Sequence, residues 1–82
     1  MDEQRRGIAA QQLLANEMLQ EALANIEARL VDQLAQAEVT PERVARLQAL
    51  LAAKRTFERY LRNVVSTGTM AAMDEEKRRK GN

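Results

Sequence analysis

The sequence predicts an all-α protein built as an antiparallel helical hairpin, because of its composition, its apolar spacing and a single proline. Only three of the 82 residues are glycine and one is proline. Alanine, leucine and charged residues with good helix propensity make up much of the remainder. We expect helices over about residues 2–37 and 41–66, followed by a short helix or arm over about 69–80.

The connection between the two long segments is predicted at the proline. Thr40 has a typical N-cap side chain, and Pro41 suits the first helical position because it has no N–H to leave unpaired. Val39 and Val44 stand at the two positions of a hydrophobic staple. A tight helix-to-helix connection is therefore expected at residues 38–44.

The first segment has apolar residues at every third or fourth position, which is the spacing of one helix face. The members of this stripe are Leu19, Leu23, Ile26, Leu30 and Leu34. Leu13, Leu14 and Met18 cluster within two turns and lie mostly away from the stripe. Such a cluster favours a second contact surface over scattered exposed side chains.

The second segment can be divided into heptads with mostly apolar a and d positions. These positions hold Leu47, Leu50, Phe57, Leu61 and Val64, with Lys54 among them. We expect the amine of Lys54 to reach Glu58, one turn later, or an acid of the first segment. On this assignment, leucine in place of Lys54 should raise thermal stability.

The C-terminal segment is predicted to form a separate docking tail over residues 67–82. Gly68 is a natural residue for ending the second helix. Beyond it, Met70 and Met73 share one face of a short helix and offer adaptable apolar contacts.

Charge is distributed unevenly along the chain. Residues 1–38 contain seven acids and three bases, whereas residues 39–66 contain two acids and six bases. An acidic helix followed by a basic one favours antiparallel pairing, within the hairpin or with a neighbouring copy.

Several chemical classes are excluded by missing residue types. The chain has neither cysteine nor histidine, so disulfides, thiol nucleophiles and imidazole acid–base chemistry are ruled out. We expect no enzyme activity, no cofactor and no metal site. The first residues lack the apolar core of a signal peptide, and no run is long enough to span a membrane. The expected location is the cytoplasm or the inside of a viral particle, without membrane attachment.

The function expected from these observations is that of a non-enzymatic interaction or structural protein. A single domain over residues 1–82, with one phenylalanine, one tyrosine and no tryptophan, has few large side chains for a core. We therefore expect partner chains to complete the core, through homo-oligomerisation or docking on a larger assembly such as a bacteriophage virion. The predicted partner interface comprises Leu13, Leu14, Met18, Leu19, Leu23, Ile26, Leu30, Leu34, Leu47, Leu50, Phe57, Leu61, Val64, Met70 and Met73.

Two alternatives come from other functional classes. Arg55, Arg59 and Arg62 fall on one side of a helix, away from the apolar stripe, and could contact nucleic-acid phosphates. The protein would then be a small nucleic-acid-binding regulator. Alternatively, the chain could act as an inhibitor that fills a helix-binding groove of a partner.

Overall fold

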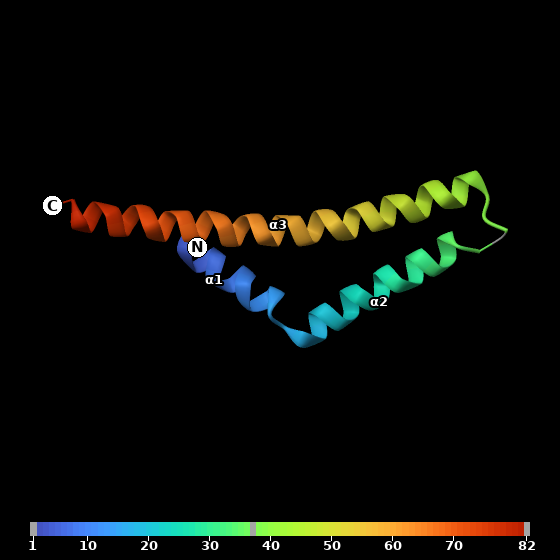
Figure 1. Ribbon diagram of the computed structural model, residues 1–82, viewed down its shortest axis with the longest axis horizontal. Helices are drawn as coiled ribbons and strands as arrows, with labels where there is room; N and C mark the ends of the chain where they lie inside the picture. Colours follow the sequence, from blue (N-terminus) through green and yellow to red (C-terminus); the bar gives the residue numbers. More distant parts are fainter. Residues whose placement is uncertain (1, 37, 82) are drawn as a thin grey trace. The chain divides into compact units, whose positions relative to one another are not determined.

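The computed structural model describes residues 2–36 and 38–81, and every regular element in that part of the chain is an α-helix. The helices are α1 (Glu3–Leu14), α2 (Glu17–Leu34) and α3 (Pro41–Lys80), as Figure 1 shows. The chain divides into two compact units. Unit 1 comprises residues 1–16 and 59–82, and unit 2 comprises residues 17–58.

The predicted start of the second helix is confirmed. The Thr40 hydroxyl accepts a hydrogen bond from the Arg43 N–H at 3.3 Å, and the Thr40 carbonyl accepts one from Val44 at 2.9 Å. At α1, the Asp2 carboxylate accepts a hydrogen bond from the Arg5 N–H at 2.8 Å. Both caps satisfy backbone donors that the helix itself leaves unpaired.

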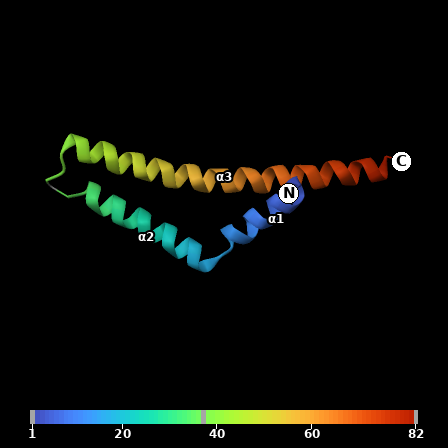
Figure 2. The same cartoon turned by 180° about the vertical axis from the view of Figure 1, so that it is seen from behind.

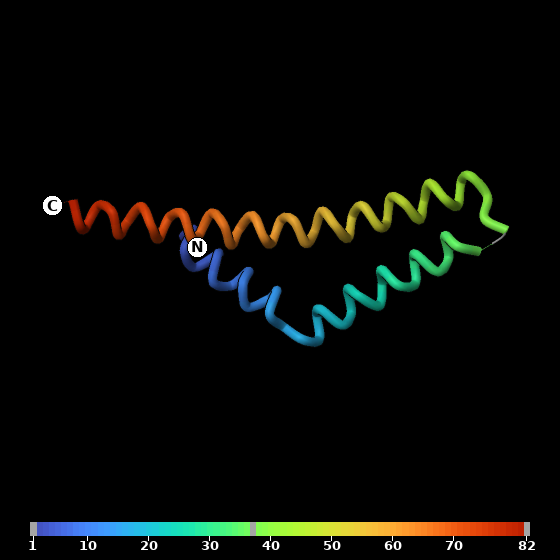
Figure 3. Tube along the Cα trace, viewed as in Figure 1, coloured from blue at the N-terminus to red at the C-terminus, as the bar shows by residue number. Residues whose placement is uncertain are grey.

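The expectation of one helix over residues 2–37 is wrong, because the chain leaves the helical path after Leu14 (Figure 3). The N–H of Asn16 bonds to the carbonyl of Leu13, a tightened turn that ends α1. Asn16 stands directly before α2, at the N-cap position. This position favours asparagine because its side chain can accept a hydrogen bond from a backbone N–H of the first turn. Residue 37, the predicted end, lies outside the described residues.

The separate C-terminal helix over residues 69–80 is also wrong, since α3 continues to Lys80. Gly68 does not end a helix: it is buried within α3, and no described glycine has a positive φ. Two acid-first pairs support the last turns, Glu75 with Arg79 at 3.5 Å and Glu76 with Lys80 at 3.1 Å.

Within unit 2, α2 lies alongside the first part of α3 in both views (Figures 1 and 2). The buried apolar side chains here are Leu23, Leu30 and Leu47, each exposed by less than a tenth. In unit 1 the buried apolar residues are Ala10 and Leu61. Each core is small, and no described side chain is completely enclosed.

Candidate interaction sites

A charged cluster lies beside the apolar core of unit 2. The Lys54 ammonium is 2.8 Å from the carboxylate of Glu58 and 3.2 Å from that of Glu27 on α2. Arg55 reaches the other oxygen of Glu27 at 3.6 Å. The Lys54 side chain is only 10% exposed. The expectation that Lys54 reaches Glu58 and an acid of the first segment is therefore confirmed.

The cluster shifts the ionisation of two of its members. The hydrogen bond from Lys54, followed by its charge, lowers the pKa of Glu27 below its usual value. The hydrogen bond to Glu58 raises the pKa of Lys54, although burial acts in the opposite direction. Both pKa shifts favour the charged forms of Glu27 and Lys54, so this pair is ionised at neutral pH.

The predicted heptad stripe on α3 is only partly buried. Leu47 and Leu61 are buried and Val64 is half-buried, but Leu50 and Phe57 are 51% and 45% exposed. The inward positions between them are taken by Leu51, Lys54 and Glu58, which are half-buried. Leu50 and Phe57 therefore lie outside the row that α3 presents to α2, and their use as a partner interface stays a prediction.

The stripe on α2 shows the same pattern. Leu23 and Leu30 are buried, and Leu19 and Leu34 are half-buried. Ile26 is 48% exposed, while Glu27 beside it contacts Lys54. On α2, the charged Glu27 rather than the apolar Ile26 therefore faces the cluster.

The predicted cluster near the start of α2 is divided between the units. Leu13 and Leu14 belong to unit 1, where Leu13 is 49% exposed and Leu14 is half-buried. Met18 belongs to unit 2 and is 65% exposed. The use of these side chains as a partner interface stays a prediction.

In unit 1, two glycines let the backbones of α1 and α3 approach closely, a contact that the apolar spacing of the sequence did not predict. A Cβ built on Gly68 would lie 2.9 Å from the Cα of Gly7 and 2.8 Å from the carbonyl oxygen of Glu3. Ala10, one turn after Gly7, is 3% exposed. Small residues at 7, 10, 68 and 71 were the available signal, since small side chains let helix backbones approach closely.

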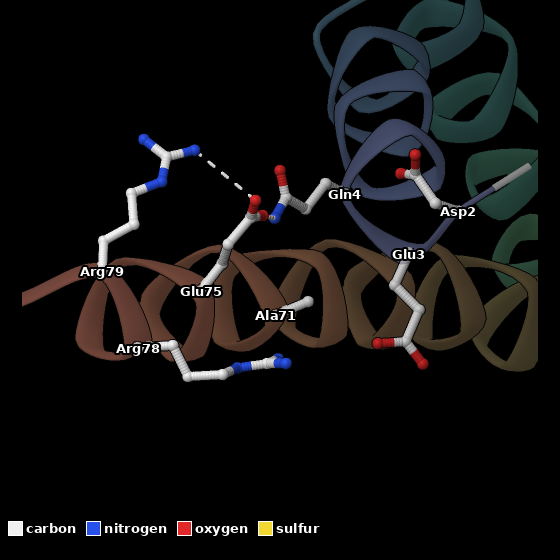
Figure 4. A pocket seen from close by; sticks show the side chains of 7 residues that line it. All are labelled: Asp2, Glu3, Gln4, Ala71, Glu75, Arg78 and Arg79. Carbon is white, nitrogen blue, oxygen red and sulfur yellow. Dashed lines mark hydrogen bonds and ion pairs between the residues drawn. The ribbon is translucent and has the colours of Figure 1, made fainter. Parts of the chain in front are cut away.

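Polar contacts flank the glycine crossing. The Arg6 guanidinium donates to the Tyr60 hydroxyl at 3.1 Å. At the other end of the crossing, the Gln4 amide donates to Glu75, which also accepts from Arg79 (Figure 4). Gln4, Glu75 and Arg79 border an open hollow of about 880 Å³ that carries charges of both signs. The hollow therefore has no single preferred ligand charge.

The remaining candidate residues are exposed. Met70 and Met73 of the predicted tail are 65% and 62% exposed on α3. Arg59 and Arg62 are exposed residues of unit 1, whereas Arg55 lies in unit 2 beside Glu27. Binding of nucleic acid by these arginines stays a prediction.

Among the described residues there is neither a candidate metal site nor a candidate membrane span. No three acidic side chains there gather in the way that a metal ion requires. Among the same residues, none of the helices combines the length and apolar character needed to cross a bilayer. In comparisons with known proteins, no family profile, curated protein or solved structure matches this sequence.

Proposed function

We propose that this chain is a non-enzymatic helical interaction protein that associates with further copies of itself. The observation that carries the proposal is the large exposed apolar area beside two small cores. The exposed large apolar side chains are Ile8, Leu13, Met18, Ile26, Val31, Leu50, Phe57, Tyr60, Met70 and Met73, at 45–65% exposure. Burying such side chains against a partner is favourable by about 25 cal/mol per Å² of apolar surface.

The proposal includes a closed antiparallel hairpin. Within unit 2, Glu27 on α2 contacts Lys54 on α3, so the two helices meet on either side of the connection between them. The cap at Thr40 and Pro41 supports a reversal at this connection.

Sedimentation velocity of the purified chain over a range of micromolar concentrations tests self-association. We expect a dimer or larger species whose population grows with concentration, because exposed apolar faces associate by mass action. Replacing exposed Arg43 with Gln serves as a control that should leave the distribution unchanged. A folded species that stays monomeric throughout would contradict the proposal.

A further inference from the structure

The outward side of α2 in unit 2 is shaped as a shallow apolar face with charged ends. Met18 and Ile26 are 65% and 48% exposed. They border a hollow of about 290 Å³, whose lining is Met18, Glu21, Ala22, Asn25, Ile26 and Arg29. At about 100° per residue, the hollow is centred on the side of α2 opposite Glu27, a residue through which α2 contacts α3.

A second apolar row lies on α3 within the same unit. Leu50 and Phe57 are exposed, and Ala53 between them is exposed as well. At about 100° per residue, the members of this row lie roughly 40–100° from Lys54, whereas Glu21, Asn25 and Arg29 lie roughly 120–160° from Glu27. The α3 row is therefore a surface separate from the α2 hollow, which lies on the side of α2 that faces away from α3.

The charges on the α2 face are complementary to themselves. Glu21 and Arg29 lie four residues before and after Asn25, and neither makes an ion pair within the described part of the chain. When a second α2 is laid over the first in the opposite direction about Asn25, each Glu21 comes next to an Arg29. This contact occurs twice, as two-fold symmetry requires.

We propose that the occupant of this face is unit 2 of a second copy, related by a two-fold axis that passes near Asn25. The two copies then pack α2 against α2 in opposite directions, with the hollow of each copy against that of the other. The inference deepens the proposed self-association and rests on it.

Charge reversal tests the pairing of the acid with the base. Glu21→Arg and Arg29→Glu should each weaken dimerisation roughly tenfold or more, because like charges then meet twice. The double variant restores opposite charges and should recover most of the wild-type dissociation constant in sedimentation. Both side chains are outside the buried core, and circular dichroism checks that each variant stays helical. Equal dissociation constants for all four proteins would overturn the proposed face.

Cross-linking tests the position of the axis. The native chain has no cysteine, so Asn25→Cys introduces a single thiol at the proposed axis. Mild oxidation should convert most of this variant to a covalent dimer. Ala24→Cys, an exposed position about 100° around α2 from Asn25, is the matched control and should remain mostly uncross-linked. Equal cross-linking of the two variants would overturn the placement of the axis.

The two experiments separate this inference from the broader proposal. Suppose that the wild type forms an oligomer, that charge reversal does not weaken it and that Asn25→Cys does not cross-link. That result would overturn the α2 face and leave self-association standing. A wild-type chain that stays monomeric at every concentration would overturn both.

Discussion

At the scale of single residues, Lys54 has a different role in the structure from the one that its position in the sequence suggests. Its position among apolar residues suggests that leucine would fit better there. The structure instead places its ammonium between Glu27 and Glu58, within an almost enclosed site. A cation so placed offsets the cost of half-burying two carboxylates.

We therefore expect Lys54→Leu alone to lower the free energy of unfolding by roughly 1–2 kcal/mol, because Glu58 loses its counter-charge. Lys54→Leu combined with Glu58→Leu should recover most of that loss, since a matched apolar pair replaces the ion pair. Chemical denaturation monitored by circular dichroism measures both. Arg55→Gln, at the exposed edge of the cluster, is the control and should change stability by less than about 0.5 kcal/mol. A stabilising single substitution would contradict this role of Lys54.

The same cluster predicts how stability depends on pH. The lowered pKa of Glu27 means that its contribution is present above its unfolded pKa and is lost as pH falls through the folded value. The raised pKa of Lys54 means that its contribution is present below its unfolded pKa and is lost as pH rises through the folded value.

The wild type should therefore exceed Lys54→Gln in melting temperature by a constant amount at neutral pH. The difference should shrink below about pH 4 and above about pH 10.5. Thermal melts across that range measure it. A difference that stays constant at both extremes would show that the cluster does not contribute through its charges.

At the scale of the elements, the crossing of α1 and α3 in unit 1 depends on two glycines. Alanine has a higher helix propensity than glycine by about 1 kcal/mol, so Gly68→Ala would stabilise an isolated α3. In this chain the added methyl would lie within 3 Å of the backbone at Glu3 and Gly7, which cannot move aside as a side chain can. The steric term opposes the propensity term, and overpacking of this kind costs about 1–3 kcal/mol.

We expect Gly68→Ala to loosen α1, seen as faster amide hydrogen exchange over residues 5–14 than in the wild type. Gly81→Ala is the matched control, because Gly81 is exposed at the end of α3 and its substitution leaves the crossing intact. Unchanged exchange in α1, together with a higher melting temperature for Gly68→Ala, would show that the two backbones do not need this close approach.

At the scale of the whole molecule, the numbers of acids and bases in each folded unit differ from those in the two sequence segments. Unit 2 contains seven acids and five bases, and unit 1 contains five acids and eight bases. Within unit 2, the acidic first segment and the basic second segment thus neutralise each other in part, as Glu27 and Lys54 do. With net charge reduced locally, apolar contacts rather than charge attraction supply most of the proposed association.

The sequence by itself determined the helical class, the cap at Thr40 and the pairing of Lys54 with Glu58. These depend on local propensity, on backbone hydrogen bonding and on i,i+4 spacing, all of which act over a few residues. Only the tertiary structure decided the close approach at Gly68, which lies within α3, and the row of α3 that faces α2. The reason is that these depend on contacts between residues far apart in sequence, Gly7 against Gly68 and Glu27 against Lys54. Such contacts outweigh the small differences in local propensity that a sequence pattern reports.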